Sequence, residues 1–128
     1  MPYRVLVVDD DAAQLDMLRR SLRHDGFDVT VSRSAIGVSA LIRDQAPDVV
    51  LLDVNIPELR GDRLLGIARK HAPKSTLFVL YSACDESYLR ALCKEAQADG
   101  WLSKSLDPTE LGRRLKALCA KRPAPPPP

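Results

Sequence analysis

The sequence predicts an α/β fold in which five parallel strands alternate with five helices. Five short apolar runs alternate along the chain with five segments whose apolar residues recur at helical spacing. The first, third and fourth runs are continuously apolar, as are parallel strands that helices cover on both faces. This alternation is typical of a (βα)₅ sheet with right-handed crossovers, and 128 residues suffice for one such domain.

The strand candidates are short runs bounded by acids or by turn-forming residues. Gly26 precedes the second run and marks the end of the helix before it. The third run places four apolar residues directly before Asp53, so a buried strand there ends on a carboxylate. The predicted strands are Arg4–Val8, Asp28–Ser32, Asp48–Leu52, Thr76–Tyr81 and Gly100–Ser103.

The helix candidates carry apolar stripes, and two of them have recognisable starts. We expect Ser34 to cap the second helix. The fifth begins with Asp107 as its cap, Pro108 in the first helical position and Glu110 to complete a capping box. The predicted helices are Gln14–Leu22, Ser34–Asp44, Gly61–His71, Glu86–Gln97 and Asp107–Ala120.

Composition limits the compartment and the classes of partner. The net charge is +2 and the basic residues are scattered, which disfavours direct binding of nucleic acid or of a membrane surface. No apolar segment reaches the roughly 18 residues of a membrane span, and the N-terminus becomes acidic too early for a signal peptide. Cys84, Cys93 and Cys119 lack the spacing of a zinc site or a redox pair. Three unpaired cysteines fit a reducing compartment, so we expect a cytoplasmic protein.

Polar side chains stand at the expected carboxyl ends of four strands. Parallel strands present these ends at one edge of the sheet, where open α/β sheets bind their ligands. We therefore expect these side chains to meet at one rim. They are Asp9–Asp11 after the first strand, Asp53 after the third, Ser82 after the fourth and Lys104 after the fifth.

Converging carboxylates at this rim indicate a cation site. Like charges at short range repel one another unless a cation neutralises them. Oxygen ligands without histidine or thiolate suit a hard cation such as Mg²⁺, which also bridges to phosphate oxygens. The hydroxyl of Ser82 and the ammonium of Lys104 are groups that a phosphoryl group needs around its oxygens. Asp11 is expected to cap the first helix rather than to bind metal.

Four stretches together resemble the receiver domain of two-component response regulators. In chain order they are VLVVDDD, VVLLDVNIPELRG, VLYSA and GWLSK, at successive predicted strand ends, and the resemblance covers about residues 3–120. It implies a receiver domain at residues 1–121 with a flavodoxin-like, doubly wound sheet of strand order 2-1-3-4-5 and helices on both faces. It also implies a signalling module that catalyses only its own aspartyl phosphorylation and dephosphorylation.

The resemblance assigns a metal role to four residues at the rim. It implies that Asp9, Asp10 and Asp53 bind Mg²⁺, with Asp10 as the more direct ligand of the acidic pair. The backbone carbonyl of Asn55 is implied to face the metal. Asp53 is in addition the implied phosphoacceptor.

The resemblance also implies how the domain is phosphorylated and how phosphorylation changes its conformation. A sensor histidine kinase or a phosphotransfer protein supplies the phosphoryl group, which Ser82 and Lys104 contact. Ser82 then moves toward the phosphoryl group, and Trp101, at the position of the family's switch aromatic, turns inward. The resulting population shift changes a protein-interaction surface for a downstream target or an output domain.

Three residues depart from the family pattern. Ser105 follows Lys104 where the family usually has proline, so the bond between them is either trans or a strained cis bond. Trp101 is bulkier than the usual tyrosine or phenylalanine, and it either packs in the core or serves as an altered switch. Cys84 lies two residues after Ser82 and either shapes hydrolysis of the phosphoryl group or is a simple loop residue.

Two rival functions follow from the same residues. A phosphorylation-independent, receiver-like scaffold is motivated by Trp101 and Ser105. A phosphatase or phosphomutase with an aspartyl nucleophile is disfavoured, because such enzymes commonly carry an acid/base aspartate where this chain has Asn55. A P-loop nucleotide-binding protein is excluded because the sequence contains no GxxxxGK[ST] motif.

The C-terminus and the oligomeric state stay open in the sequence. Residues 122–128, RPAPPPP, form a proline-rich tail that is either a frayed terminus or the start of a linker. A homodimer through the fourth helix, fifth strand and fifth helix is consistent with the resemblance. The charged residues expected near that face are Arg90, Lys94, Asp99 and Arg113.

Overall fold

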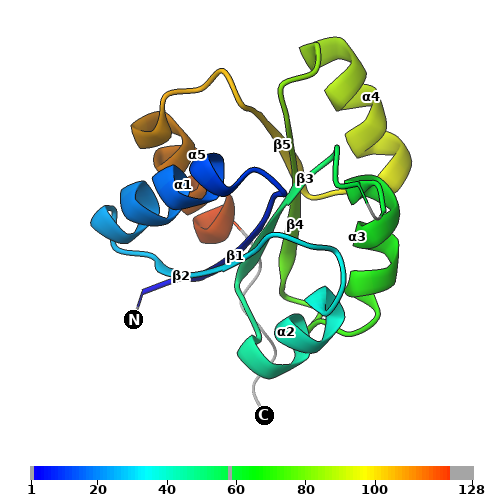
Figure 1. Cartoon of the computed structure of the whole chain (residues 1–128), viewed down its shortest axis with the longest axis horizontal. Helices are drawn as coiled ribbons and strands as arrows, with labels where there is room; N and C mark the ends of the chain where they lie inside the picture. Colours follow the sequence, from blue (N-terminus) through cyan, green and yellow to red (C-terminus); the bar gives the residue numbers. More distant parts are fainter. Residues whose placement is uncertain (1, 58, 122–128) are drawn as a thin grey trace.

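The predicted sheet is present in the computed structural model, which describes residues 2–57 and 59–121. Within these residues, five parallel strands pair in the order β2-β1-β3-β4-β5 (Figure 1). The α/β fold class and the strand order are therefore confirmed. The strands are β1 (Arg4–Val8), β2 (Asp28–Ser32), β3 (Val49–Asp53), β4 (Leu77–Ser82) and β5 (Gly100–Ser103).

Helices cover both faces of the sheet, as the doubly wound fold requires. Figure 1 shows α1 and α5 on one side and α2, α3 and α4 on the other. Their apolar stripes face the sheet, and Leu15, Leu18 and Leu22 of α1 are buried. The helices are α1 (Ala12–His24), α2 (Val38–Gln45), α3 (Gly61–Arg69), α4 (Glu86–Ala96) and α5 (Pro108–Lys121).

The core consists of two apolar layers, one on each face of the sheet. Alternate strand residues point to opposite faces, so Leu6 and Val8 of β1 join the layer under α2, α3 and α4. Val5 and Val7 join the layer under α1 and α5. Every residue of the central strand β3 is buried. The polar residues of β1 and β3 therefore stand at the strand ends, where they can reach solvent or a ligand.

Two helix starts agree with the sequence. The carboxylate of Asp11 accepts hydrogen bonds from the backbone N–H groups of Ala13 (3.0 Å) and Gln14 (3.2 Å), which caps α1. The carboxylate of Asp107 accepts one from the N–H of Thr109 at 2.8 Å, which caps α5. Both caps lie at the same edge of the sheet as the predicted site, and they fix the loops that lead away from β1 and β5.

Two details of helix capping differ from the prediction. Ser34 is not the cap of α2; the cap is Gly37, whose φ of +85° lies in the left-handed region that favours glycine. The hydroxyl of Ser34 instead accepts a hydrogen bond from the N–H of Ile36 at 3.0 Å, within a separate turn before the helix. Glu110, expected to complete a capping box, lies 3.3 Å from Arg113 in an ion pair on the surface of α5.

Two further expectations concern the membrane and the tail. None of the helices in residues 2–57 and 59–121 combines the length and the hydropathy that crossing a membrane requires. The proline-rich tail at residues 122–128 lies outside the described residues.

Candidate functional site

Two buried aspartates lie side by side at the carboxyl ends of β1 and β3. These strands are paired neighbours with Val8 opposite Leu52, so Asp9 and Asp53 follow at the same edge of the sheet. Asp9 is fully buried and Asp53 is 3% exposed. Asp53 is the last residue of β3, one residue further than predicted, and it pairs in register with Tyr81 of β4. The sheet itself therefore fixes the backbone that carries this carboxylate.

A third carboxylate completes an acidic cluster with these two. Asp10 is exposed in the loop after β1, and one carboxylate oxygen from each of Asp9, Asp10 and Asp53 lies within 4.8 Å of the others. The structure thus brings together the acids that the sequence placed at two separate strand ends. Asn55 is exposed two residues beyond Asp53, and its N–H donates to Asp53 Oδ1 at 3.1 Å.

The carboxylate of Asp9 is buried, and one of its two oxygens receives a hydrogen bond from a backbone N–H group. Its Oδ1 accepts the N–H of Asp11 at 3.0 Å, whereas its Oδ2 is buried without a hydrogen bond and faces the ammonium of Lys104 at 2.9 Å. Burial raises the pKa of Asp9 and the charge of Asp53 adds to this, while the Asp11 N–H and Lys104 act in the opposite direction. A buried oxygen of this kind, in an all-oxygen donor set, fits a hard divalent cation.

Lys104 bridges the two buried acids. Its ammonium lies 2.9 Å from Asp9 Oδ2 and 3.2 Å from Asp53 Oδ2, and 5.3 Å from the centre of the Tyr81 ring. Burial by itself would lower the pKa of Lys104, but the close contact with Asp9 and the charge of Asp53 outweigh burial and raise the pKa overall. Lys104 is therefore held as a cation at the edge of the acidic cluster.

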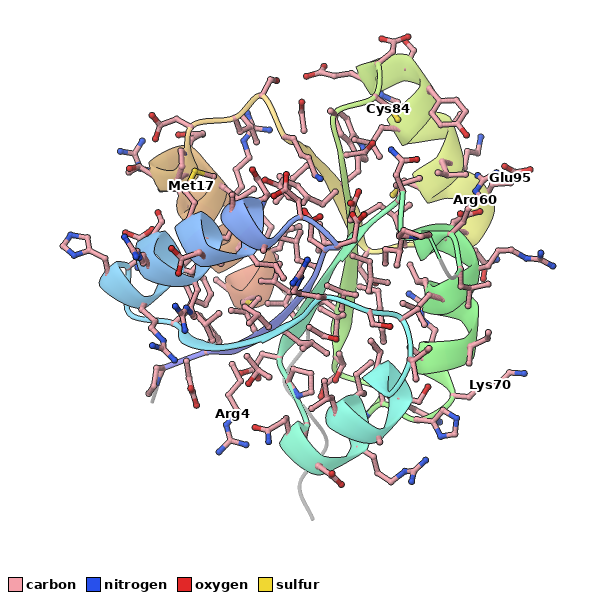
Figure 2. All side chains as sticks on the ribbon, viewed as in Figure 1. Arg4, Met17, Arg60, Lys70, Cys84 and Glu95 are labelled. Carbon is pink, nitrogen blue, oxygen red and sulfur yellow. The ribbon has the colours of Figure 1, made fainter. Side chains whose placement is uncertain are left out.

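The hydroxyl of Ser82 is buried at the end of β4 and is engaged by the next turn. It donates to the sulfur of Cys84 at 2.8 Å and accepts the N–H of Cys84 at 3.1 Å. The carbonyl of Ser82 accepts the N–H of Lys104 at 2.8 Å, which ties the ends of β4 and β5 together. Figure 2 shows Cys84 in the loop just before α4.

Two predicted departures can be compared with the structure. The described residues contain no cis peptide bond, so the Lys104–Ser105 bond is trans. Trp101 is half-buried and packs against the core layer under α2, α3 and α4, and the guanidinium of Arg90 lies 5.8 Å from its ring centre. Its role in switching stays a prediction.

The sequence did not assign a role to the Tyr81 side chain. Tyr81 is buried, its ring faces the ammonium of Lys104, and its hydroxyl accepts a hydrogen bond from the side-chain amide of Gln14. Burial raises the pKa of the Tyr81 hydroxyl. The single available signal was its position directly before Ser82 at a strand end, because the contacts with α1 and β5 are long-range.

Gly61 allows the loop after β3 to fold back onto the acidic edge. A Cβ at this position would lie 2.3 Å from the carbonyl oxygen of Asp53, far inside van der Waals contact. The N–H of Gly61 also donates to the carbonyl of Val54 at 3.0 Å. The absence of a side chain at Gly61 therefore determines how closely α3 begins beside Asp53.

We expect Gly61→Ala to lower the free energy of unfolding by about 1–3 kcal/mol, because the methyl group must displace backbone. Urea denaturation followed by circular dichroism measures this change. Gly66→Ala is the matched control, since Gly66 lies on the same helix with nothing within 4 Å of the added carbon. At that helical position alanine should be neutral or stabilising by up to about 1 kcal/mol. Equal effects of the two substitutions would contradict the close approach.

The comparisons with known sequences agree on one family. A family model described as "Response regulator receiver domain" matches residues 5–116. "Response regulator MprA" of Mycobacterium sp. (strain KMS) is 37% identical over 118 residues, which are 92% of this chain and 51% of the relative. "DNA-binding response regulator MtrA" of Mycobacterium tuberculosis is 34% identical over 117 residues, which are 91% of this chain and 50% of the relative. The chain thus spans about half the length of these curated relatives.

Solved structures show the same fold. A response regulator receiver domain protein (CheY-like) from Methanospirillum hungatei superposes with a TM-score of 0.84 at 25% identity, covering 94% of this chain and 96% of that one. The chemotaxis response regulator CheY4 of Vibrio cholerae gives a TM-score of 0.83 at 24% identity, over 92% of this chain and 99% of that one. At this identity the second likeness concerns the fold alone.

Proposed function

Because the chain belongs to the response regulator receiver domain family, we propose that Asp53 accepts a phosphoryl group in a Mg²⁺-dependent reaction. The observation that carries this proposal is the ammonium of Lys104, which lies 2.9 Å from Asp9 and 3.2 Å from Asp53. One edge of the sheet thereby holds a carboxylate acceptor, further carboxylates for a cation and a positive charge for the phosphoryl oxygens. These are the components that phosphoryl transfer needs.

The acidic cluster fits the metal that the family implies. Asp9, Asp10, Asp53 and the backbone carbonyl of Asn55 would hold Mg²⁺, and the buried Asp9 Oδ2 without a hydrogen bond supports this assignment. When bound, Mg²⁺ supplies positive charge that offsets the charge of the carboxylates and of the phosphoryl oxygens.

The transfer step assigns a distinct task to each residue at the edge. An oxygen of Asp53 forms a bond to the phosphorus of a phosphohistidine while the P–N bond breaks, and the electron pair leaves with the imidazole nitrogen. Lys104 offsets charge on the phosphoryl oxygens, and Ser82 donates its hydroxyl to one of them. Attack of water on the phosphorus later returns the Asp53 carboxylate and inorganic phosphate. The chain thus acts as a signalling module rather than as an enzyme on a separate substrate.

The length of the relatives bears on the output. MtrA is described as DNA-binding, and this chain matches about half of it. We assign residues 1–121 to a receiver domain, because the family model matches residues 5–116. In this proposal the phosphoryl group comes from a sensor histidine kinase or a phosphotransfer protein. Its output passes to a downstream protein target or to an output domain, through a switch that includes Ser82 and Trp101.

The surface formed by α4, β5 and α5 is the proposed interaction surface, and a homodimer is one form that the interaction takes. Arg90 and Lys94 are exposed on α4, where the guanidinium of Arg90 also lies over the Trp101 ring. Asp99 and Arg113, in contrast, already form ion pairs within the chain, with Arg69 and Glu110 respectively. A dimer contact through this surface would therefore depend more on the two residues of α4.

The function is tested by labelling with a small phosphodonor in the presence and absence of metal. With acetyl phosphate and Mg²⁺, we expect the wild-type chain to gain a phosphoryl group that intact mass spectrometry detects. With excess EDTA in place of Mg²⁺, labelling should cease, because the carboxylates then face the incoming phosphoryl charge without a divalent cation. Labelling that is equally fast in EDTA, or no labelling with Mg²⁺, would contradict the proposal.

A phosphorylation-independent scaffold is the second candidate, favoured by the half-buried Trp101 and by Ser105 in place of proline. It predicts that a binding partner, or the chain's own association, is insensitive to labelling. Size-exclusion chromatography with light scattering, before and after labelling, distinguishes the two candidates. A change in mass that appears only after labelling supports the switch.

A further inference from the structure

A pair of serine hydroxyls closes the turn that contains Lys104. Ser103 ends β5 and is 7% exposed; its hydroxyl accepts the N–H of Ser105 at 3.1 Å and lies 2.7 Å from the Ser105 hydroxyl. The carbonyl of Ser103 accepts the N–H of Leu106 at 3.1 Å. Lys104 and Ser105 are therefore the two central residues of a β-turn, and the first residue of that turn braces it with its own side chain.

The backbone of Lys104 is consequently held on both sides. Its N–H donates to the carbonyl of Ser82 at 2.8 Å, and Ser82 is the register partner of Ser103 in the sheet. The next N–H, that of Ser105, is bound by the Ser103 hydroxyl. With the backbone fixed at both points, the long Lys104 side chain starts from a defined position and places its ammonium between Asp9 and Asp53.

The residue type at position 105 explains why such a brace is needed. A proline would restrict the backbone after Lys104 through its ring, and a cis proline defines its own turn type. This chain has a trans bond and a serine there, which impose no such restriction. Ser105 retains the N–H that proline lacks, and the Ser103 hydroxyl uses that N–H as its partner.

We propose that Ser103 and Ser105 are positioning residues, whose paired hydroxyls hold the turn that aims the Lys104 ammonium between Asp9 and Asp53. The inference about the reaction rests on the proposed function, since it presupposes transfer to Asp53. Charge that develops on the phosphoryl oxygens is stabilised only by a cation at the right place, so a small displacement of the ammonium slows transfer. The first test therefore measures the position of Lys104 without metal or phosphodonor.

The metal-free test is competitive acetylation of lysine amines, followed by peptide mass spectrometry. In the wild-type chain, Lys104 should react more slowly than the exposed Lys74 and Lys94, because its ammonium is engaged by two carboxylates. Ser103→Ala should raise the reactivity of Lys104 relative to those two lysines by about threefold, the effect of weakening one hydrogen bond. Ser103→Thr keeps the hydroxyl and should restore the wild-type ratio.

The second test is the rate of labelling by acetyl phosphate with Mg²⁺. Ser103→Ala should lower the maximal rate about fivefold, the equivalent of about 1 kcal/mol, with the half-saturating donor concentration within about twofold of wild type. A general structural defect would not lower the maximal rate alone, with the half-saturating concentration unchanged, and at the same time raise the acetylation of Lys104 relative to Lys74 and Lys94. Ser105→Ala should give a smaller decrease, because the Ser103 hydroxyl still accepts the N–H of residue 105.

The outcomes separate the two proposals. If wild type is not labelled at all, the proposed function fails, while the acetylation ratio still decides whether the hydroxyls position Lys104. If wild type is labelled and Ser103→Ala matches it in both ratio and rate, the positioning role is wrong. Ser103→Thr behaving like Ser103→Ala would also overturn it, since the hydroxyl would then not be the active feature. Should Ser103→Ala fail to fold, Ser105→Ala, at an exposed position, is measured instead; its expected changes are smaller, and wild-type values of both ratio and rate would overturn the role of the paired hydroxyls.

Discussion

Asp53→Asn is expected to abolish labelling by acetyl phosphate and Mg²⁺, with a rate at least about 1,000-fold below wild type. The amide has nearly the shape of the carboxylate, but it lacks the anionic oxygen that attacks phosphorus and offers one charged ligand fewer to the metal. The fold should survive, because the amide oxygen can still accept the N–H of Asn55, as Asp53 Oδ1 does at 3.1 Å. Intact mass spectrometry over time measures the rate.

The control is Asp44→Asn, which removes the same charge at an exposed position on α2 and should label like wild type. Undiminished labelling of Asp53→Asn would show that another side chain accepts the phosphoryl group, and the assignment of Asp53 would be withdrawn. Asp53→Asn also serves as the control for the measurement of oligomer size. A phosphodonor should change the size of wild type and leave that of Asp53→Asn unaltered if association is the output.

Lys104→Ala is expected to have two large effects, one on the reaction and one on stability. Labelling should slow by about 100-fold, because the cation that offsets charge on the phosphoryl oxygens is lost. In the absence of metal, the free energy of unfolding should fall by about 2 kcal/mol, because Asp9, fully buried, then faces Asp53 without the ammonium at 2.9 Å. Urea denaturation at neutral pH, with and without Mg²⁺, measures the second effect.

The pH dependence of this stability difference has a defined sign. The two carboxylates raise the folded-state pKa of Lys104 above its unfolded value, so its contribution is present at neutral pH. The contribution is lost only as the pH rises through the folded-state pKa, above the unfolded value of about 10.4. Lys94→Ala, at an exposed position, is the control and should change neither quantity. Equal stability of Lys104→Ala and wild type at neutral pH would contradict the bridging contact.

The sequence predicted the acidic edge because its determinants are local. Each acid directly follows an apolar run, and parallel strands bring such positions to one edge without further information. The close approach of α3 to Asp53 depends, in contrast, on Gly61 lying against the Asp53 carbonyl, and that contact joins two elements that are separate in the sequence. The cap of α2 also escaped the prediction, because Ser34 and Gly37 are both common cap residues and only the left-handed φ of Gly37 decides between them.

The turn after β5 shows a further limit of sequence reasoning. From the sequence, Ser105 shows only that the proline usual in the family is missing after Lys104. In the structure, the same residue supplies an N–H and a hydroxyl to Ser103, so the loop is braced by different chemistry. A comparison of residue types at one position could not show this, because the compensation lies two residues upstream and depends on a side-chain rotamer.

The hydrogen bond between Ser82 and Cys84 has a consequence for the timing of the proposed signal. Ser82 donates its hydroxyl to sulfur, a weak acceptor, whereas a phosphoryl oxygen is a charged acceptor worth about 1.5–3 kcal/mol. The Ser82 hydroxyl lowers its free energy by moving from the Cys84 sulfur to a phosphoryl oxygen, and it can do so only while the phosphoryl group is present. Under the proposed function, the chemical lifetime of the aspartyl phosphate would set how long the rearranged loop persists, and the loop would return to its thiol contact when the phosphate is hydrolysed.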